Sequence, residues 1–297
     1  MAGFDAQEIQ TVAAWLIYTL GVAFCAGLAP SLMRGGARKG DPSIASALFL
    51  TFAAACGYAL LVYGGNRSGL AALTGTAWGK VAVCGLIVWF TVLSLMTSLT
   101  GGLVNKVFPM LNASSVALFF ASWFFLKTPL SLWSLCGVLL MLLGTVLILS
   151  RSSAVFGQLW FAYALLALAG CCVLGVLRMT WVKDIPADVF CTGVCGVAGV
   201  LMWIFVFLRG KHRVMGRMTA WNWILPPLAA VCLGAGRLVM LLRDKLTDPG
   251  IFDPTQVVAF VLLFLLARIV QKEKLPGTAF FGMLITVGGM VVMTLGL

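Results

Sequence analysis

The sequence predicts an all-α polytopic membrane protein with about ten transmembrane helices in two inverted five-helix repeats. Three observations lead to this fold class: the composition, the spacing of the apolar runs, and a match of the chain to itself. Of the 297 residues, 62% are hydrophobic and only 10% are charged, and the mean hydropathy is +1.07. An ordinary soluble domain is about half apolar and about a quarter charged. The composition therefore indicates a chain that lies largely in lipid.

The apolar runs have the length of membrane helices. Crossing the hydrocarbon core takes about 20 apolar residues in a helix, because lipid offers no partner to an open backbone group. Runs this long also exclude a transmembrane barrel, whose strands alternate in polarity. Charge, glycine and proline divide the chain into ten candidate helices: 11–33, 43–64, 79–99, 103–126, 131–150, 157–178, 187–208, 221–242, 252–271 and 275–296.

The two halves of the chain match each other at an offset of 145 residues, a test for internal repeats. The matched pairs are Trp15 with Trp160, Tyr18 with Tyr163, Pro109 with Pro254, Lys127 with Lys272, Leu130 with Leu275, Gly137 with Gly282 and Gly144 with Gly289. One ungapped register thus relates the first, fourth and fifth helices to the sixth, ninth and tenth. We expect one repeat at residues 1–150 and a second at residues 151–297.

The number of helices in each unit predicts that the repeats are inverted. Five is odd, so the second copy enters the membrane from the opposite side. The densest basic clusters follow odd-numbered helices: Arg34, Arg38 and Lys39; Arg209, Lys211, Arg213 and Arg217; and Arg268, Lys272 and Lys274. The positive-inside rule makes this side cytoplasmic. The protein is therefore expected in the cell membrane with both termini on the non-cytoplasmic side.

The charge and the cysteines point to no other class of protein. The net charge of +11 comes from residues between apolar runs, and no basic surface with interleaved aromatic residues indicates nucleic acid. The nine cysteines lie almost all in apolar stretches, where free cysteine behaves as a small hydrophobe. His212 is the single histidine, so neither a metal site nor a catalytic set is expected. We therefore predict no enzyme activity and no cofactor.

Gly137 and Gly144, like Gly282 and Gly289, lie two helical turns apart and therefore on one face of a helix. Missing side chains let another helix approach closely. These glycines are expected to form packing faces and not to bind a ligand.

Polar residues cluster near the prolines at 109 and 254. Asn112, Ser114 and Ser115 follow the first, while Asp253, Thr255 and Gln256 surround the second. Oxygen atoms near broken helix ends coordinate substrate in transporters built from repeats. Alternatively, the prolines occupy ordinary first turns and the polar residues cap them. Asn112, Ser115 and Gln256 are the candidates for substrate binding.

Arg237 is a charge well inside an apolar segment, and such a charge is costly in lipid. It is a substrate-binding candidate that would favour a carboxylate, a phosphate or dense hydroxyl groups. Alternatively, it extends to the interface or pairs with Asp244, Asp248 or Asp253. All nine acidic residues lie at or beyond helix ends, which argues against a proton antiporter with a central glutamate.

Aromatic residues give the remaining candidates. Trp15 and Tyr18, like Trp160 and Tyr163, are spaced i and i+3 on equivalent helices. Belts at the membrane interface explain such residues, and aromatic walls of a central cavity are the alternative. Trp89, further along its helix, faces either the cavity or lipid.

The sequence resembles the EamA-type members of the drug/metabolite transporter superfamily. The second half carries the pattern Pro254, Glu273, Leu275, Gly282 and Gly289, and the first half carries Pro109, Leu130, Gly137 and Gly144, with Thr128 where the family usually has glutamate. The resemblance implies ten helices, with the first, third, fourth, sixth, eighth and ninth around a cavity and the fifth and tenth supporting it. Many members of the family are drawn with cytoplasmic termini, so the orientation stays open.

Together these features predict a transporter of a small polar metabolite that works by alternating access between the repeats. An amino acid, a sugar and a nucleobase-like compound are the expected substrate classes. The alternatives are an exporter of drugs or other cationic compounds and a membrane scaffold with no transport cycle. The expected partners are a small-molecule substrate and the lipid bilayer, with no nucleic acid, for a monomer or a homodimer.

Overall fold

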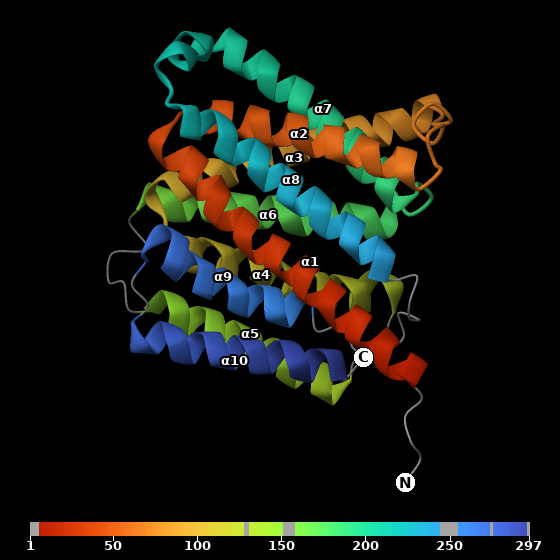
Figure 1. Cartoon of the computed structure of the whole chain (residues 1–297), viewed down its shortest axis with the longest axis vertical. Coiled ribbons are helices and arrows are strands. Elements are labelled where there is room, and N and C mark those ends of the chain that lie inside the picture. The colour runs from red at the N-terminus through yellow and green to blue at the C-terminus, as the bar shows by residue number, and fades with distance from the viewer. Residues whose placement is uncertain (1–5, 128–130, 151–157, 244–254, 274–275, 296–297) are drawn as a thin grey trace.

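The computed structural model describes residues 6–127, 131–150, 158–243, 255–273 and 276–295, and its regular structure there is helical. The helices are α1 (Ala6–Lys39), α2 (Pro42–Tyr63), α3 (Gly75–Gly101), α4 (Val104–Leu126), α5 (Leu132–Ser150), α6 (Leu159–Thr180), α7 (Ala187–Leu208), the short 3-10 helix η2 (Lys211–Arg217), α8 (Ala220–Arg243), α9 (Thr255–Gln271) and α10 (Gly277–Leu295). The first turn of α1 and the last turn of α10 lie at the same side of the molecule (Figure 1).

Eight helices in the described ranges are long and apolar enough to cross a membrane, and α9 and α10 are shorter apolar helices. The outer faces carry exposed leucine, phenylalanine and tryptophan side chains, as at Leu132, Phe124 and Trp133. Water would not tolerate this much apolar surface, whereas lipid does. The prediction of an all-helical multi-pass membrane protein is thus confirmed, while ten spans in two repeats stay a prediction.

One predicted helix boundary was wrong in a way that matters for function, and one proline lies elsewhere in its helix than expected. The basic residues after position 33 ended the first apolar run, but α1 continues to Lys39, so Arg34 lies inside a helix. Arginine and lysine are good helix formers, and charge alone does not end a helix. Pro109 does not open the fourth helix but lies inside α4, whose first residue is Val104. Pro254 lies outside the described residues.

Polar side chains and ion pairs fix the ends of several helices. Asp41 caps α2 by accepting a hydrogen bond of 2.9 Å from the backbone N–H of Ser43. Its carboxylate also lies 2.7 Å from Nζ of Lys211 in η2. Burial disfavours the charged carboxylate, but the bonds from Lys211 and Ser43 outweigh it and hold the pKa of Asp41 below its usual value. This contact ties the segment between α7 and α8 to the start of α2.

The helices α4 and α9 end in the same backbone conformation. Lys127 and Lys272, which directly follow them, both have φ of 53°, and no other described residue except glycine has a positive φ. The left-handed conformation costs a residue with a Cβ atom about 1–2 kcal/mol, so it is not adopted by default. These two lysines are also a matched pair in the 145-residue offset.

The helices α5 and α10 lie side by side at one end of the bundle (Figure 1) and approach to backbone contact. A Cβ atom on Gly137 would lie 2.7 Å from the carbonyl oxygen of Gly289, and one on Gly144 would lie 2.6 Å from that of Gly282. The two helices therefore run antiparallel, with the glycines of each facing those of the other. The packing role predicted for the four glycines is confirmed.

The helices α2 and α7 are also antiparallel neighbours. Gly57 contacts Thr192, Gly199 contacts Leu50, and the indole N–H of Trp203 donates a 2.9 Å hydrogen bond to Thr51. The other large contacts come in corresponding pairs: α1 with α8 and α6 with α3; α1 with α9 and α6 with α4; α2 with α8 and α7 with α3.

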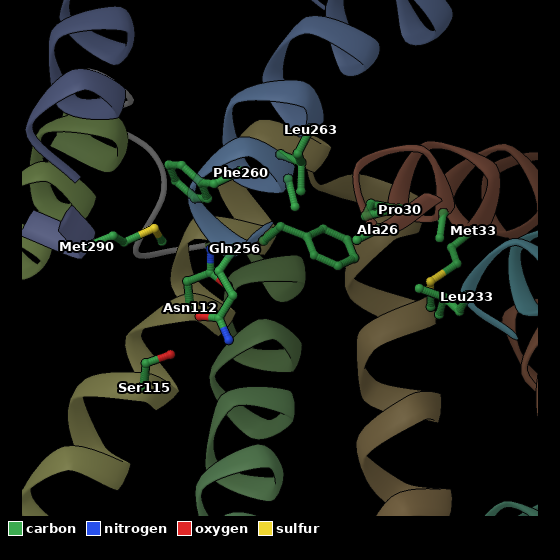
Figure 2. Close-up of a pocket in the computed structure, with 13 residues that line it drawn as sticks. Ala26, Pro30, Met33, Asn112, Ser115, Leu233, Gln256, Phe260, Leu263 and Met290 are labelled. Carbon is green, nitrogen blue, oxygen red and sulfur yellow. The ribbon is translucent and has the colours of Figure 1, made fainter. Parts of the chain in front are cut away.

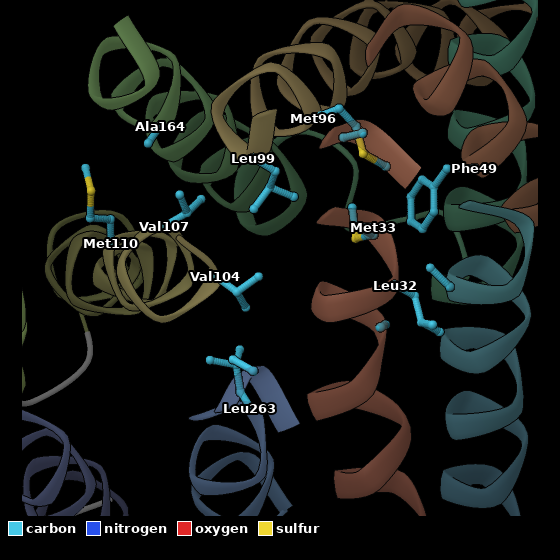
Figure 3. Packing of buried hydrophobic residues seen from close by; sticks show 14 of the residues in the cluster. Leu32, Met33, Phe49, Met96, Leu99, Val104, Val107, Met110, Ala164 and Leu263 are labelled. Atoms are coloured by element: carbon cyan, nitrogen blue, oxygen red, sulfur yellow. The ribbon is translucent and has the colours of Figure 1, made fainter. Parts of the chain in front are cut away.

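The interior is apolar and joins helices from both halves of the chain. Figure 3 shows Met33 of α1, Phe49 of α2, Leu99 of α3, Val104 of α4 and Leu263 of α9 in one buried cluster. Each buried side chain of this size contributes about 1.5–3 kcal/mol in water, but lipid is as apolar as the cluster, so close packing takes over this role in the membrane.

The glycine contact gives a matched test. Gly289→Ala places its methyl group 2.7 Å from the backbone of α5, whereas Gly288→Ala meets nothing within 4 Å. We expect Gly289→Ala to lower the free energy of unfolding by about 1–3 kcal/mol, as overpacking does. Gly288→Ala should leave it unchanged or raise it by up to about 1 kcal/mol. Thermal unfolding of the purified protein in detergent measures both, and equal melting temperatures would contradict the close contact.

Candidate functional site

A cavity of about 290 Å³ lies between α1, α4, α8 and α9 (Figure 2). Pockets for small molecules are typically about 300–1,000 Å³, so this cavity suits a compound at the small end of that range. Its lining residues are Ala26, Ala29, Pro30 and Met33 of α1, Phe108, Asn112 and Ser115 of α4, Leu233 of α8, Gln256, Ala259, Phe260 and Leu263 of α9, and Met290 of α10.

The polar side chains of the lining are Asn112, Ser115 and Gln256, all three of them predicted from the sequence. Figure 2 shows them close together on one side, with Pro30, Met33 and Leu233 on the other. None of the three is hydrogen-bonded to another group within the described part of the chain. No charged residue lines the cavity in those ranges. The cavity therefore offers free amide and hydroxyl groups in apolar surroundings.

Helix geometry places these side chains together. On α4, Phe108, Asn112 and Ser115 are four and three residues apart, so they share one face. On α9, Gln256 stands in the first turn, and Phe260 and Leu263 follow it on the same face. Each helix thus presents a polar group and an aromatic ring to the same space.

The backbone of α1 adds an acceptor. Pro30 lies inside this helix and has no N–H group, so the carbonyl of Ala26 cannot receive its usual helical hydrogen bond from residue 30. Both residues line the cavity. Irregular backbone of this kind is tolerated in membranes where it borders a cavity.

A buried ion pair lies beside the cavity. Arg34 donates a hydrogen bond from Nη1 to Glu273, and the two side chains are only 6% and 1% exposed. The carboxylate of Glu273 also accepts hydrogen bonds from the backbone N–H groups of Val104, at 2.9 Å, and Asn105, at 3.2 Å. Leu103 precedes α4 and offers no capping side chain, so Glu273 caps this helix in its place. We call Arg34, Val104, Asn105 and Glu273 the Glu273 cluster.

The Glu273 cluster joins three of the helices that line the cavity. Arg34 follows Met33 on α1, Val104 lies one turn before Phe108 on α4, and Glu273 follows the end of α9. A further hydrogen bond of 2.7 Å runs from the side chain of Gln271 to the carbonyl of Ser31. Glu273 thus lies beyond a helix end, as the sequence indicated, but it is buried and paired. The counterpart position, Thr128, lies outside the described residues.

Arg237 does not line the cavity. It lies one turn beyond Leu233 on α8, and its Nη2 atom is 3.2 Å from Oδ1 of Asp188, at the start of α7. Both side chains are partly exposed. The structure thus gives Arg237 an ion pair with an acid that the sequence did not suggest, while the expected partners Asp244, Asp248 and Asp253 lie outside the described residues.

The aromatic candidates are not brought together around the cavity. Trp160 is buried, where its ring packs on Gly101 and Gly102 and its N–H donates to Gln158. Trp89 packs edge-on against Phe205, with ring centroids 5.6 Å apart. The others are Trp15 and Tyr18, which are half-buried, and Tyr163, which is exposed. In the described ranges neither α3 nor α6 contributes to the lining, contrary to the expectation from the family resemblance.

The sequence did not predict which apolar residues line the cavity. Phe108, Phe260, Leu263 and Met33 are single apolar residues within apolar helices, and nothing in the sequence distinguishes them from lipid-facing neighbours. Pro30 is the exception, because a proline inside a membrane helix marks a break in the backbone hydrogen bonds.

Residues 13–150 match the family model described as the EamA-like transporter family. Nine chains of solved structures also match the protein. One of them, described only as the crystal structure of a protein, is 20% identical and aligns with a TM-score of 0.59 over 96% of this chain and 97% of that chain. At this identity the likeness shows the fold alone. No curated protein matches the chain.

The burial of the Glu273 cluster makes a prediction for stability. Glu273→Gln leaves Arg34 buried without a counter-charge, so we expect the free energy of unfolding to fall by about 3–5 kcal/mol. Asp184→Asn is the matched control, because Asp184 is 73% exposed and 3.8 Å from Nζ of Lys80. An exposed pair contributes at most about 1 kcal/mol.

The double variant Arg34→Met/Glu273→Gln removes the unpaired charge as well and should be more stable than Glu273→Gln alone. Melting temperatures in detergent compare the four proteins. If Glu273→Gln and Asp184→Asn lowered the melting temperature equally, the buried pair would not hold the fold together as described.

Proposed function

We propose that this chain is an EamA-like transporter of the drug/metabolite transporter superfamily and that it carries a small polar metabolite by alternating access; residues 13–150 match the model of this transporter family. The observation that carries the proposal is the cavity between α1, α4, α8 and α9, in which three free polar side chains lie among membrane helices. Polar groups inside a membrane are costly and are typically functional.

The proposed transport cycle rests on two inverted repeats, at residues 1–150 and 151–297. The family match ends at residue 150, where the sequence predicts the first repeat to end. Corresponding helices that touch, α5 with α10 and α2 with α7, are antiparallel, as an inverted repeat requires. The left-handed backbone at Lys127 and Lys272 and the corresponding pairs of helix contacts support the same assignment.

The position of the cavity between helices of both proposed repeats supports its assignment as the substrate site. Two of its main helices, α1 and α4, belong to the first proposed repeat, and α8 and α9 belong to the second. Substrate sites of transporters with inverted repeats lie at the interface between the repeats near the middle of the bilayer. A rocking motion of one repeat against the other would therefore expose the same site to each side in turn.

The Glu273 cluster is the proposed gate at one end of this path. It joins α1, α4 and the end of α9 on the side of the basic loops, which we expect to be cytoplasmic in the cell membrane. Opening towards that side requires the ends of these helices to separate and the ion pair to break.

The cavity favours a metabolite transporter over an exporter of cationic drugs. A carboxylate in the site would attract a cationic substrate, and the lining in the described ranges contains none. A membrane scaffold needs no polar cavity between its helices, and transport itself separates that alternative from the proposal.

Counterflow in proteoliposomes tests the function. Vesicles with purified protein are loaded with one unlabelled metabolite, and uptake of the same labelled compound is measured for amino acids, sugars and nucleobases. We expect saturable uptake of one class, accelerated by the compound inside. The double variant Asn112→Leu/Gln256→Leu should lower this uptake at least about ten-fold, because it removes two polar contacts from the site.

The control is Ser122→Ala, on the same helix as Asn112 but outside the lining, where the hydroxyl donates to the carbonyl of Phe119. It should transport like the unchanged protein. If no metabolite class exchanged across vesicles that contain folded protein, the transport proposal would be wrong.

A further inference from the structure

The lining of the cavity constrains the charge of its occupant. Asn112, Ser115 and Gln256 supply the polar side chains, and the described lining contains no residue that ionises. Burying an ion without a counter-charge costs far more than burying a neutral polar group. Arg237 does not supply that charge, because it lies outside the lining and is paired with Asp188. The site therefore favours an uncharged compound over a carboxylate, a phosphate or an ammonium ion.

The carboxamides constrain the pattern of hydrogen bonds. A carboxamide presents an NH₂ donor and a carbonyl acceptor side by side in one plane. It pairs with a partner that offers an acceptor beside a donor, as glutamine and asparagine do with the edge of adenine. Asn112 and Gln256 offer this pattern from two different helices, and Figure 2 shows them adjacent. The hydroxyl of Ser115 and the carbonyl of Ala26 add further single contacts.

The remaining lining constrains the shape. Phe108 and Phe260 supply aromatic rings, and Leu233, Leu263 and Met33 supply apolar contacts. A planar ring can stack on such side chains while its edge bonds to the amides. A sugar has hydroxyl groups around its whole ring, and most of them would face apolar residues without a partner. A zwitterionic amino acid would lack a counter-charge for both of its ionic groups.

We propose that the cavity binds an uncharged planar compound whose edge carries adjacent hydrogen-bond donors and acceptors, such as a cyclic amide or a nucleobase-like heterocycle. This inference rests on the proposed transport function and names the substrate class of the same site. The three polar side chains form hydrogen bonds with the edge of the compound, and the aromatic and aliphatic residues pack against its faces.

A series of compounds with one shape and different charge tests the proposal. Benzamide, benzoate and benzamidine share a planar ring and differ in being neutral, anionic and cationic, and uracil provides a neutral cyclic amide. Affinities come from thermal shift of the purified protein, because a ligand of the folded state raises its melting temperature. We expect uracil and benzamide to bind at least about ten-fold more tightly than the two ions. Equal or tighter binding of benzoate or benzamidine would overturn the proposal.

Substitutions locate the binding to the predicted amides. Asn112→Asp at pH 8 replaces an amide donor with a carboxylate. It should therefore weaken the binding of uracil about ten-fold and strengthen the binding of benzamidine. Gln256→Leu should weaken the binding of both uracil and benzamide, and Ser122→Ala should change the binding of neither compound. Unchanged binding of uracil in both Asn112→Asp and Gln256→Leu would overturn the assignment.

The two proposals fail in different ways. If the protein exchanges a metabolite in vesicles but prefers ions in the charge series, the substrate class is wrong and the transport function stands. If uracil binds with the expected order and no compound crosses the membrane, the site is correct and the transport function is wrong.

Discussion

The carboxylate of Glu273 is the interaction on which the arrangement around the cavity depends. It is buried, and it binds a cation on α1 and two backbone N–H groups at the start of α4 from its position at the end of α9. Neither charge is stable alone in an apolar interior. The three helices must therefore meet at this point, and each of them also lines the cavity, through Met33, Phe108 and Leu263 respectively.

Much of the fold could be predicted because lipid restricts the possibilities. Every backbone group must be bonded within its own segment, so the length and boundaries of an apolar run almost define a helix. The packing role of Gly137 and Gly144 followed from their spacing, since glycines two turns apart leave a flat strip for a neighbouring helix. The structure adds that the glycines of α10 face them. Asn112, Ser115 and Gln256, which line the cavity, could be selected as candidates because a polar residue in an apolar run is exceptional.

The rest depended on contacts that the sequence does not encode locally. Arg34 and Glu273 are 239 positions apart, and each stands near basic residues that the positive-inside rule explains without any ion pair. Arg237 looked like a buried charge because of its apolar neighbours, yet its side chain is partly exposed and pairs with Asp188. Apolar residues such as Phe108 face a cavity or lipid according to the rotation of the helix, and packing against other helices decides that rotation.

The contact between α5 and α10 and the Glu273 cluster differ in what opening them would cost. Between α5 and α10, backbone contacts backbone through glycines, and separation would lose close packing that no alternative contact replaces. At the Glu273 cluster, a buried ion pair has a small net free energy, because desolvation cancels much of the attraction. The Nε atom of Arg34, Oγ of Ser31 and Oδ1 of Asn105 are also buried without a partner among the described residues. Water that enters the opened cluster would hydrogen-bond to all three atoms, so hydration offsets part of the cost of breaking the pair.

A ligand that binds the two forms of the cavity with affinities differing by a few kcal/mol is then sufficient to shift the equilibrium. The rigid contact between α5 and α10 and the labile contact at Glu273 together favour opening at the cluster and not within the supporting pair.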